Sequence, residues 1–191
     1  NSENIAAHFG DVVLDPQRLV VTETTRVRVY FVGEASGYKN AVGVNLSGVG
    51  LHEGDPKLLI PDETCRLKLY DAANQVQGDP PRLPMEPFGE RTEEFPLHPG
   101  DFVELGRIEA GTRLNFFLVS QQEERVYTTV PEANPDGIPH MVALAVEDSP
   151  YMVISFEDMY GGGDRDYSDC VLAIEMSHYN IQALLGRIDP W

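Results

Sequence analysis

Short apolar segments rich in β-branched and aromatic residues recur along the chain, and turns rich in glycine, proline and asparagine separate them. In Arg26–Val32 the apolar and polar residues alternate, which places Val27, Val29 and Phe31 on one face of a half-buried strand. The pattern predicts strands at Leu19–Thr22, Val27–Val32, Ala41–Leu46, Cys65–Tyr70, Phe102–Leu105, Leu114–Val119, Val126–Val130, Met141–Val146, Tyr151–Phe156 and Val171–Met176. Many short strands without helices between them predict an all-β fold, an antiparallel β-sandwich with a jelly-roll-like arrangement.

Two of these segments, Tyr151–Phe156 and Val171–Ile174, are apolar on both faces and should therefore lie in the middle of a sheet. Helical patterns occur only near the two ends, at Glu3–Phe9 and Tyr179–Leu185, and predict short accessory helices. Six prolines within residues 77–99 predict a long irregular loop that crosses an edge or an end of the sandwich.

The chain has 191 residues, which favours one all-β domain over residues 1–191. Its 14 Lys and Arg against 31 Asp and Glu give a formal charge of −17, which opposes binding to nucleic acids and to anionic membranes. The longest apolar stretch, Met141–Val146, is far shorter than a membrane span, so we expect no membrane insertion of this chain. Because the first residue is Asn1 rather than Met, we expect a processed or excised form.

The chain contains two cysteines, Cys65 and Cys170, and its sequence leaves open whether they pair. Cys170 opens the apolar run Cys170–Ile174, so we expect a small buried thiol within a strand.

The densest group of carboxylates lies between two apolar strands, around the three consecutive glycines Gly161–Gly163. Its members are Glu157, Asp158, Asp164, Asp166 and Asp169. Calcium takes six to eight oxygen ligands, and a divalent ion offsets the mutual repulsion of converging carboxylates. The loop therefore predicts a Ca²⁺ site, and the alternative is a solvated acidic turn.

Other metal sites fit the sequence less well. Asp164, Asp166 and Glu175 occupy the first, third and twelfth positions of a possible EF-hand loop, but its sixth position is Asp169 instead of glycine. The five histidines show no paired spacing of the kind that zinc sites use, and magnesium seldom uses a dense cage of protein ligands.

Aromatic residues beside the acidic loop give a second hypothesis. Tyr160 and Tyr167 could stack on sugar rings, and Asn134 and Asp136 could bind sugar hydroxyls, so we count these four as possible ligand-binding residues. The alternative is that the rings pack in the core or rim of the sandwich. A glycosidase, which needs a carboxylate pair, is a third and weaker hypothesis. Since the chain has no nucleophile or phosphate-loop motif, we expect that it is not an enzyme.

The motif Phe156–Asp158, followed by a glycine-containing spacer and Gly163–Asp169, resembles the bacterial "domain of unknown function 4114" family. Gly37–Gly43 and Asn134–His140 resemble other elements of that family, so the likeness spans about residues 27–176. Ser168 stands where the family usually has asparagine, and Cys170 where it usually has an aliphatic residue.

The resemblance implies an extracellular, secreted or cell-surface β-sandwich module that binds calcium and has no established catalytic activity. The expected function is therefore that of a calcium-binding structural or adhesive module of a bacterial surface protein. The alternative is a calcium-dependent carbohydrate-binding domain. The expected partners are surface glycans or other cell-surface proteins.

Overall fold

A computed structural model describes residues 12–38, 40–51, 54–60, 99–120 and 123–188. Within these ranges it contains strands β1 (Val12–Leu14), β2 (Thr25–Gly33), β3 (Asn40–Asn45), β4 (Pro56–Ile60), β5 (Phe102–Ile108), β6 (Asn115–Ser120), β7 (Arg125–Thr128), β8 (Met141–Ala145), β9 (Tyr151–Phe156) and β10 (Cys170–Glu175). Helix α3 (His178–Leu184) follows the last strand, and two short 3-10 helices span Pro16–Arg18 and Pro131–Ala133.

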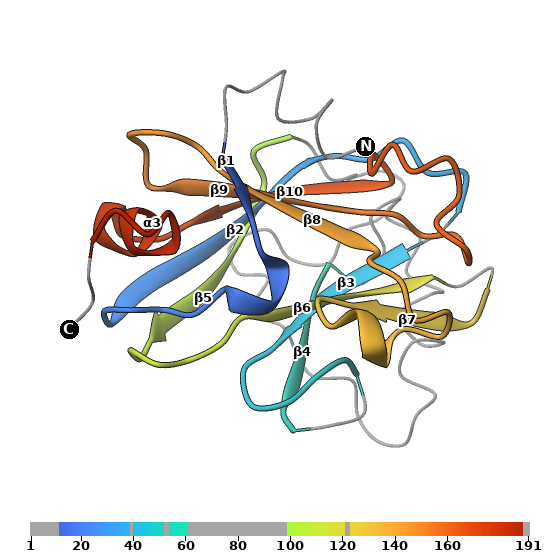
Figure 1. The fold of residues 1–191 in the computed structure, drawn as a ribbon, viewed down its shortest axis with the longest axis horizontal. Coiled ribbons are helices and arrows are strands. Elements are labelled where there is room, and N and C mark those ends of the chain that lie inside the picture. The colour runs from blue at the N-terminus through green and yellow to red at the C-terminus, as the bar shows by residue number, and fades with distance from the viewer. Residues whose placement is uncertain (1–11, 39, 52–53, 61–98, 121–122, 189–191) are drawn as a thin grey trace.

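The strands form two antiparallel sheets, which confirms the predicted all-β sandwich (Figure 1). The larger sheet has the order β1-β8-β9-β10-β2-β5, and the smaller one has the order β4-β3-β6-β7. Alternating side chains from both sheets meet in one core: Val27, Val29 and Phe31 from the larger sheet, Phe116 and Leu118 from the smaller one. The predicted alternation along β2 is thus confirmed, because Arg26, Arg28 and Tyr30 lie on its less buried face.

Strands β9 and β10 occupy the two central positions of the larger sheet, as their apolar character on both faces predicts. They pair directly, with Phe156 opposite Cys170 at one end of the ladder. Cys170 is fully buried there, as expected for the first residue of this strand. The chain between them, residues 157–169, therefore starts and ends on the two central strands of the larger sheet, at the opposite end of the sandwich from α3 (Figure 1).

The sequence prediction was wrong or incomplete at three strands. Leu19–Thr22 does not form a regular strand, because only Val20 makes a β-bridge, to Arg113, directly after a 3-10 turn. Strands β1 and β4 were not predicted, since β1 has only three residues and β4 begins with a proline. The predicted C-terminal helix exists as α3, whose N-cap Ser177 accepts a hydrogen bond from the backbone N–H of Asn180.

Several predictions fall outside the described residues. They are the helix Glu3–Phe9, the strand Cys65–Tyr70, the possible partner Cys65 and all of the loop 77–99 except Pro99. The single-domain organisation and the jelly-roll connectivity remain predictions. In the described part of the chain, no helix has the length and apolar character that crossing a bilayer requires.

Close packing of the smaller sheet makes Gly43 in β3 a sensitive position. A Cβ at Gly43 would overlap the ring of Phe117 and lie 2.6 Å from the carbonyl oxygen of Lys57. We expect Gly43→Ala to lower the free energy of unfolding by about 1–3 kcal/mol, measured by urea denaturation. Gly33→Ala is the matched control, because the space around Gly33 in β2 is open. Equal stability of the two variants would contradict the packing described for β3.

Candidate metal centre

The loop between β9 and β10 brings all five predicted carboxylates together in two overlapping groups. One group consists of Glu157, Asp158 and Asp169, and the other of Glu157, Asp164 and Asp166. In each group the three residues offer carboxylate oxygens within 4.8 Å of one another. Since calcium–oxygen distances are about 2.3–2.6 Å, a single ion can contact all three oxygens of either group. Glu157 is the member that the two groups share.

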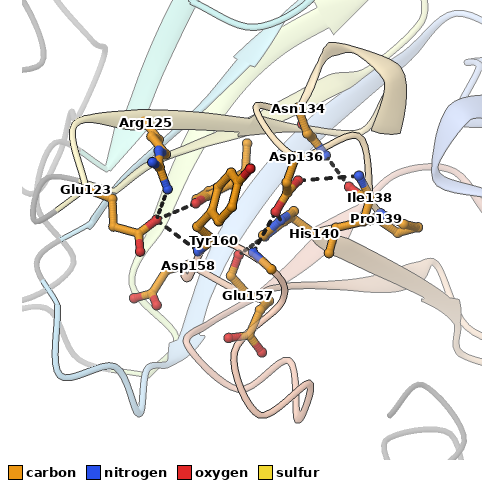
Figure 2. A network of polar contacts seen from close by, with 12 residues as sticks. Glu123, Arg125, Asn134, Asp136, Ile138, Pro139, His140, Glu157, Asp158 and Tyr160 are labelled. Carbon is orange, nitrogen blue, oxygen red and sulfur yellow. Dashed lines mark hydrogen bonds and ion pairs between the residues drawn. The ribbon is translucent and has the colours of Figure 1, made fainter.

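Glu157 is held at the centre of this site by its backbone and by its burial. Its N–H donates to the carbonyl oxygen of His140 (3.0 Å), and its own carbonyl oxygen contacts His140 Nδ1 (2.9 Å). The residue is only 2% exposed, and its buried Oε2 has no hydrogen-bond partner in the part of the chain that the structure describes. Figure 2 shows the Glu157 carboxylate pointing away from the His140 ring. A buried carboxylate oxygen that accepts no hydrogen bond is costly unless a cation or a proton occupies the space beside it.

Gly163 lies directly against this carboxylate. Its φ is +42°, and a Cβ at this position would overlap Glu157 Oε1. Only glycine combines this backbone conformation with such a close approach to the glutamate. The last of the three consecutive glycines is thus required by the packing of the site.

Asp158 is also buried, but its carboxylate accepts hydrogen bonds. Its Oδ2 accepts hydrogen bonds from the Ser36 hydroxyl and from Asn40 Nδ2, the latter at 2.7 Å. Its backbone N–H donates to Asp169 Oδ2 at 2.9 Å, which joins the beginning of the loop to its end. These contacts fix two of the candidate ligands against the sandwich and preorganise the site.

Asp164 and Asp166 form the solvent-exposed side of the loop. Asp164 Oδ1 accepts from the N–H of Asp166 (3.2 Å), and Asp166 Oδ1 accepts from the N–H of Ser168 (2.8 Å). The intervening residues Arg165 and Tyr167 have φ values of 60° and 55°. Two successive Asx turns with left-handed residues between them curl the chain, so the two aspartates stay on the side of Glu157.

The electrostatics of the loop follow from this crowding. Burial, together with the charges of Asp169 and the other loop aspartates, raises the pKa of Glu157 to about 8. Burial and the charge of Asp158 raise the pKa of Asp169 to about 6, although the N–H of Asp158 acts in the opposite direction. Without a cation, Glu157 therefore holds a proton at neutral pH, and a divalent ion would take the place of that proton.

His140 connects the loop to the segment before β8. Its Nε2 contacts Asp136 Oδ2 at 2.9 Å (Figure 2). The same oxygen also accepts from the N–H of Gly161 (2.7 Å), and the His140 ring stacks on Tyr127 with centroids 3.8 Å apart. Despite its burial, hydrogen bonds from Gly161 and His140 lower the pKa of Asp136. His140 thus links the backbone carbonyl of Glu157 to Asp136 in the 134–137 loop.

The four possible ligand-binding residues lie in two settings. Asn134 is buried, accepts a hydrogen bond from the Thr128 N–H (2.7 Å) and donates one to the Ile138 carbonyl oxygen (2.8 Å). Asp136 accepts a hydrogen bond from the Gly161 N–H, so both side chains are used in contacts within the protein. Tyr160 is 50% exposed, with the Arg125 guanidinium 4.1 Å from its ring centroid.

The remaining residue of the four, Tyr167, is half-buried. Its hydroxyl donates to the Pro139 carbonyl oxygen (3.3 Å), and burial, followed by the charge of Glu157, raises its pKa. Tyr160 is consequently the most exposed of the four possible ligand-binding residues.

The sequence did not predict the residues outside the loop that form hydrogen bonds to it. Ser36 and Asn40 lie 122 and 118 residues before Asp158, so no local pattern shows that they bind it. Glu123 was also missed: its Oε2 accepts from the N–H of Tyr160 (2.9 Å) and from the Tyr127 hydroxyl (2.5 Å). The one available signal was Asn40, which lies in the Gly37–Gly43 element of the family resemblance.

These observations define the class of protein: an antiparallel β-sandwich with a preorganised acidic loop between the two central strands of its larger sheet. Comparison with protein families matches residues 108–177 to the family described as "Domain of unknown function (DUF4114)". This match confirms the predicted family resemblance over residues 108–177, which include β6 to β10 and the whole acidic loop, whereas Gly37–Gly43 lies outside the matched segment. Neither curated proteins nor solved structures gave a match.

Proposed function

We propose that the protein is a calcium-binding module whose acidic loop holds the ion with Glu157, Asp158, Asp164, Asp166 and Asp169. The observation that carries this proposal is the buried Oε2 of Glu157, which has no hydrogen-bond partner among the described residues and belongs to a side chain that lies among converging carboxylates. Calcium suits the site because it binds carboxylate and carbonyl oxygens in flexible geometry and accepts six to eight of them. The site would complete its coordination with backbone oxygens and water.

The role that fits this site is structural or adhesive rather than catalytic. The loop starts at the end of β9 and ends at the start of β10, so an ion bound within it ties together the two central strands of the larger sheet. It would also fix the 34–36 segment, which bonds to the loop through Ala35 N–H to the Ser168 carbonyl (3.1 Å) and through Ser36 to Asp158. Binding would stiffen one end of the sandwich.

An extracellular location follows from the same proposal. Calcium modules outside the cell work at about 10⁻⁴–10⁻³ M calcium, a concentration at which even a weak site of exposed carboxylates fills. The formal charge of −17 would also be partly neutralised by bound divalent ions. We therefore propose a secreted or cell-surface protein whose partners are other surface proteins.

The experiment that tests calcium binding is thermal unfolding with calcium, with EGTA, and with magnesium as the control ion. Calcium at about 100 times its dissociation constant should add about 2.7 kcal/mol to the free energy of unfolding. We expect a higher Tm in calcium than in EGTA and a smaller shift with magnesium. Identical melting curves in all three conditions would refute the proposed function.

A second candidate function, calcium-dependent glycan binding, is favoured by one observation. Met159 and Tyr160 are exposed beside the acidic loop, and Arg125 lies over the Tyr160 ring. An exposed ring with a cation and carboxylates nearby is suited to stacking on a sugar and binding its hydroxyls. A glycan array with and without calcium separates the two functions, because only the second predicts binding that is lost on chelation and in Tyr160→Ala.

A further inference from the structure

The two groups of carboxylates differ in their surroundings although they share Glu157. Asp158 is buried and Asp169 half-buried, and Asp158 is fixed by Ser36 and Asn40. Asp164 and Asp166 are exposed and are held only by Asx turns within the loop. We call Glu157, Asp158 and Asp169 the inner group. Glu157 with the exposed Asp164 and Asp166 is the outer group.

Glu157 has the geometry of a bridging ligand. It belongs to both groups, it is almost fully buried, and its Oε2 has no hydrogen-bond partner within the described ranges. A carboxylate has two oxygens and can bind a different cation with each, as in two-metal sites whose ions lie about 3.5–4 Å apart. The buried, unpartnered oxygen is an observation independent of the number of acids, and it belongs to the carboxylate that the two groups share.

The charge of the loop leads to the same conclusion. The five carboxylates of the two groups carry five negative charges when they are all ionised. One divalent cation leaves three of these charges uncompensated, partly in a buried environment, whereas two cations leave one. Buried like charges repel strongly because the dielectric around them is low.

We propose that the loop binds two calcium ions bridged by Glu157, a tightly held inner ion and a weaker outer ion that exchanges with the solvent. This inference rests on the proposed function and adds a graded response to it. The inner ion, with Asp158 and Asp169, stabilises the connection between β9 and β10. The outer ion, with Asp164 and Asp166, orders the exposed turn only at higher calcium concentrations.

The test is a calcium titration by isothermal titration calorimetry, with bound calcium measured separately by atomic absorption after dialysis. Wild-type protein should bind two ions per chain in two phases, with dissociation constants at least tenfold apart. The double variant Asp164→Asn/Asp166→Asn keeps the side-chain oxygens that make the Asx turns but removes two ligand charges. It should lose the weak phase, bind one ion and keep the Tm shift of the tight phase.

The matched control is Asp148→Asn, an exposed aspartate outside the loop whose φ of 52° asparagine tolerates equally well. It should bind two ions as the wild type does. One ion per wild-type chain would overturn the two-ion inference and leave the proposed function intact. No bound calcium at all would overturn both. Loss of both phases in the Asp164/Asp166 double variant, with wild-type circular dichroism, would overturn the division into inner and outer ions.

Discussion

Replacing Glu157 with glutamine is expected to raise the Tm of the calcium-free protein and to abolish the stabilisation by calcium. The wild-type carboxyl group is buried among aspartates, and its pKa is raised to about 8. At pH 8 about half of this carboxyl is ionised, and more of it above pH 8; the ionised form repels Asp158, Asp164 and Asp169, whereas an amide carries no charge. The amide can also donate a hydrogen bond to a neighbouring carboxylate.

The gain in the calcium-free state should be on the order of 1–3 kcal/mol at pH 8. Differential scanning calorimetry in EGTA and in calcium measures both effects on the same samples. Glu132→Gln is the matched control, since Glu132 is exposed on the 3-10 helix Pro131–Ala133 and belongs to neither group of carboxylates. A Glu157→Gln variant that melts lower than the wild type in EGTA, yet keeps its full calcium shift, would contradict the role of Glu157.

Calcium affinity is expected to fall by about tenfold per pH unit between pH 8 and pH 6, because the ion must displace a proton from Glu157. Below pH 6 the decrease should steepen, since Asp169, whose pKa is raised to about 6, also becomes protonated. Titrations at several pH values, in buffers of different ionisation enthalpy, measure the affinity and the number of protons released. An affinity that is constant from pH 6 to pH 8 would exclude Glu157 as a ligand.

In the calcium-free protein, the contribution of Glu157 to stability should increase as the pH falls, whereas the calcium affinity should decrease. A carboxyl whose pKa is higher in the folded than in the unfolded state keeps its proton after the unfolded chain has lost it. The contribution of Glu157 to stability is therefore complete below about pH 4.5 and is lost as the pH rises to about 8. Subtracting the Tm of Glu157→Gln from that of the wild type at each pH in EGTA isolates this contribution, and the difference should become more negative as the pH rises.

The central part of the fold could be predicted because its signals are local. Alternation in β2 and two-sided apolar character in β9 and β10 identify their positions in the sheets, since side-chain direction has a period of two along any strand. Strands β1 and β4 lack such signals. Strand β1 is too short to show a period of two. Strand β4 forms by pairing with β3, and the residues of β4 alone do not predict that pairing.

The candidate site could be predicted in part for the same reason. Its five carboxylates lie within one loop, so the sequence contains all of them, and the three glycines mark the bend. What the sequence could not show is the division into two groups, which depends on the Asx turns around Arg165 and Tyr167. Nor could it show that Ser36 and Asn40, from the other end of the chain, bind Asp158.

The function of Glu157 also depends on its three-dimensional environment. In the sequence it is one acidic residue among five, and it was expected to be a ligand like the others. Among the residues that the structure describes, it alone belongs to both groups, and its buried Oε2 has no hydrogen-bond partner there. Its neighbour Gly163 acquires a specific role only when the loop is folded against it.

A crystal structure of the protein grown in excess calcium, with anomalous data collected at long wavelength, tests the central claim most directly. The account predicts anomalous density inside the loop, with Glu157 bound to the cation and Asp158 and Asp169 within about 2.3–2.6 Å of it. Density elsewhere, or aspartates directed into solvent around an empty loop under those conditions, would contradict it.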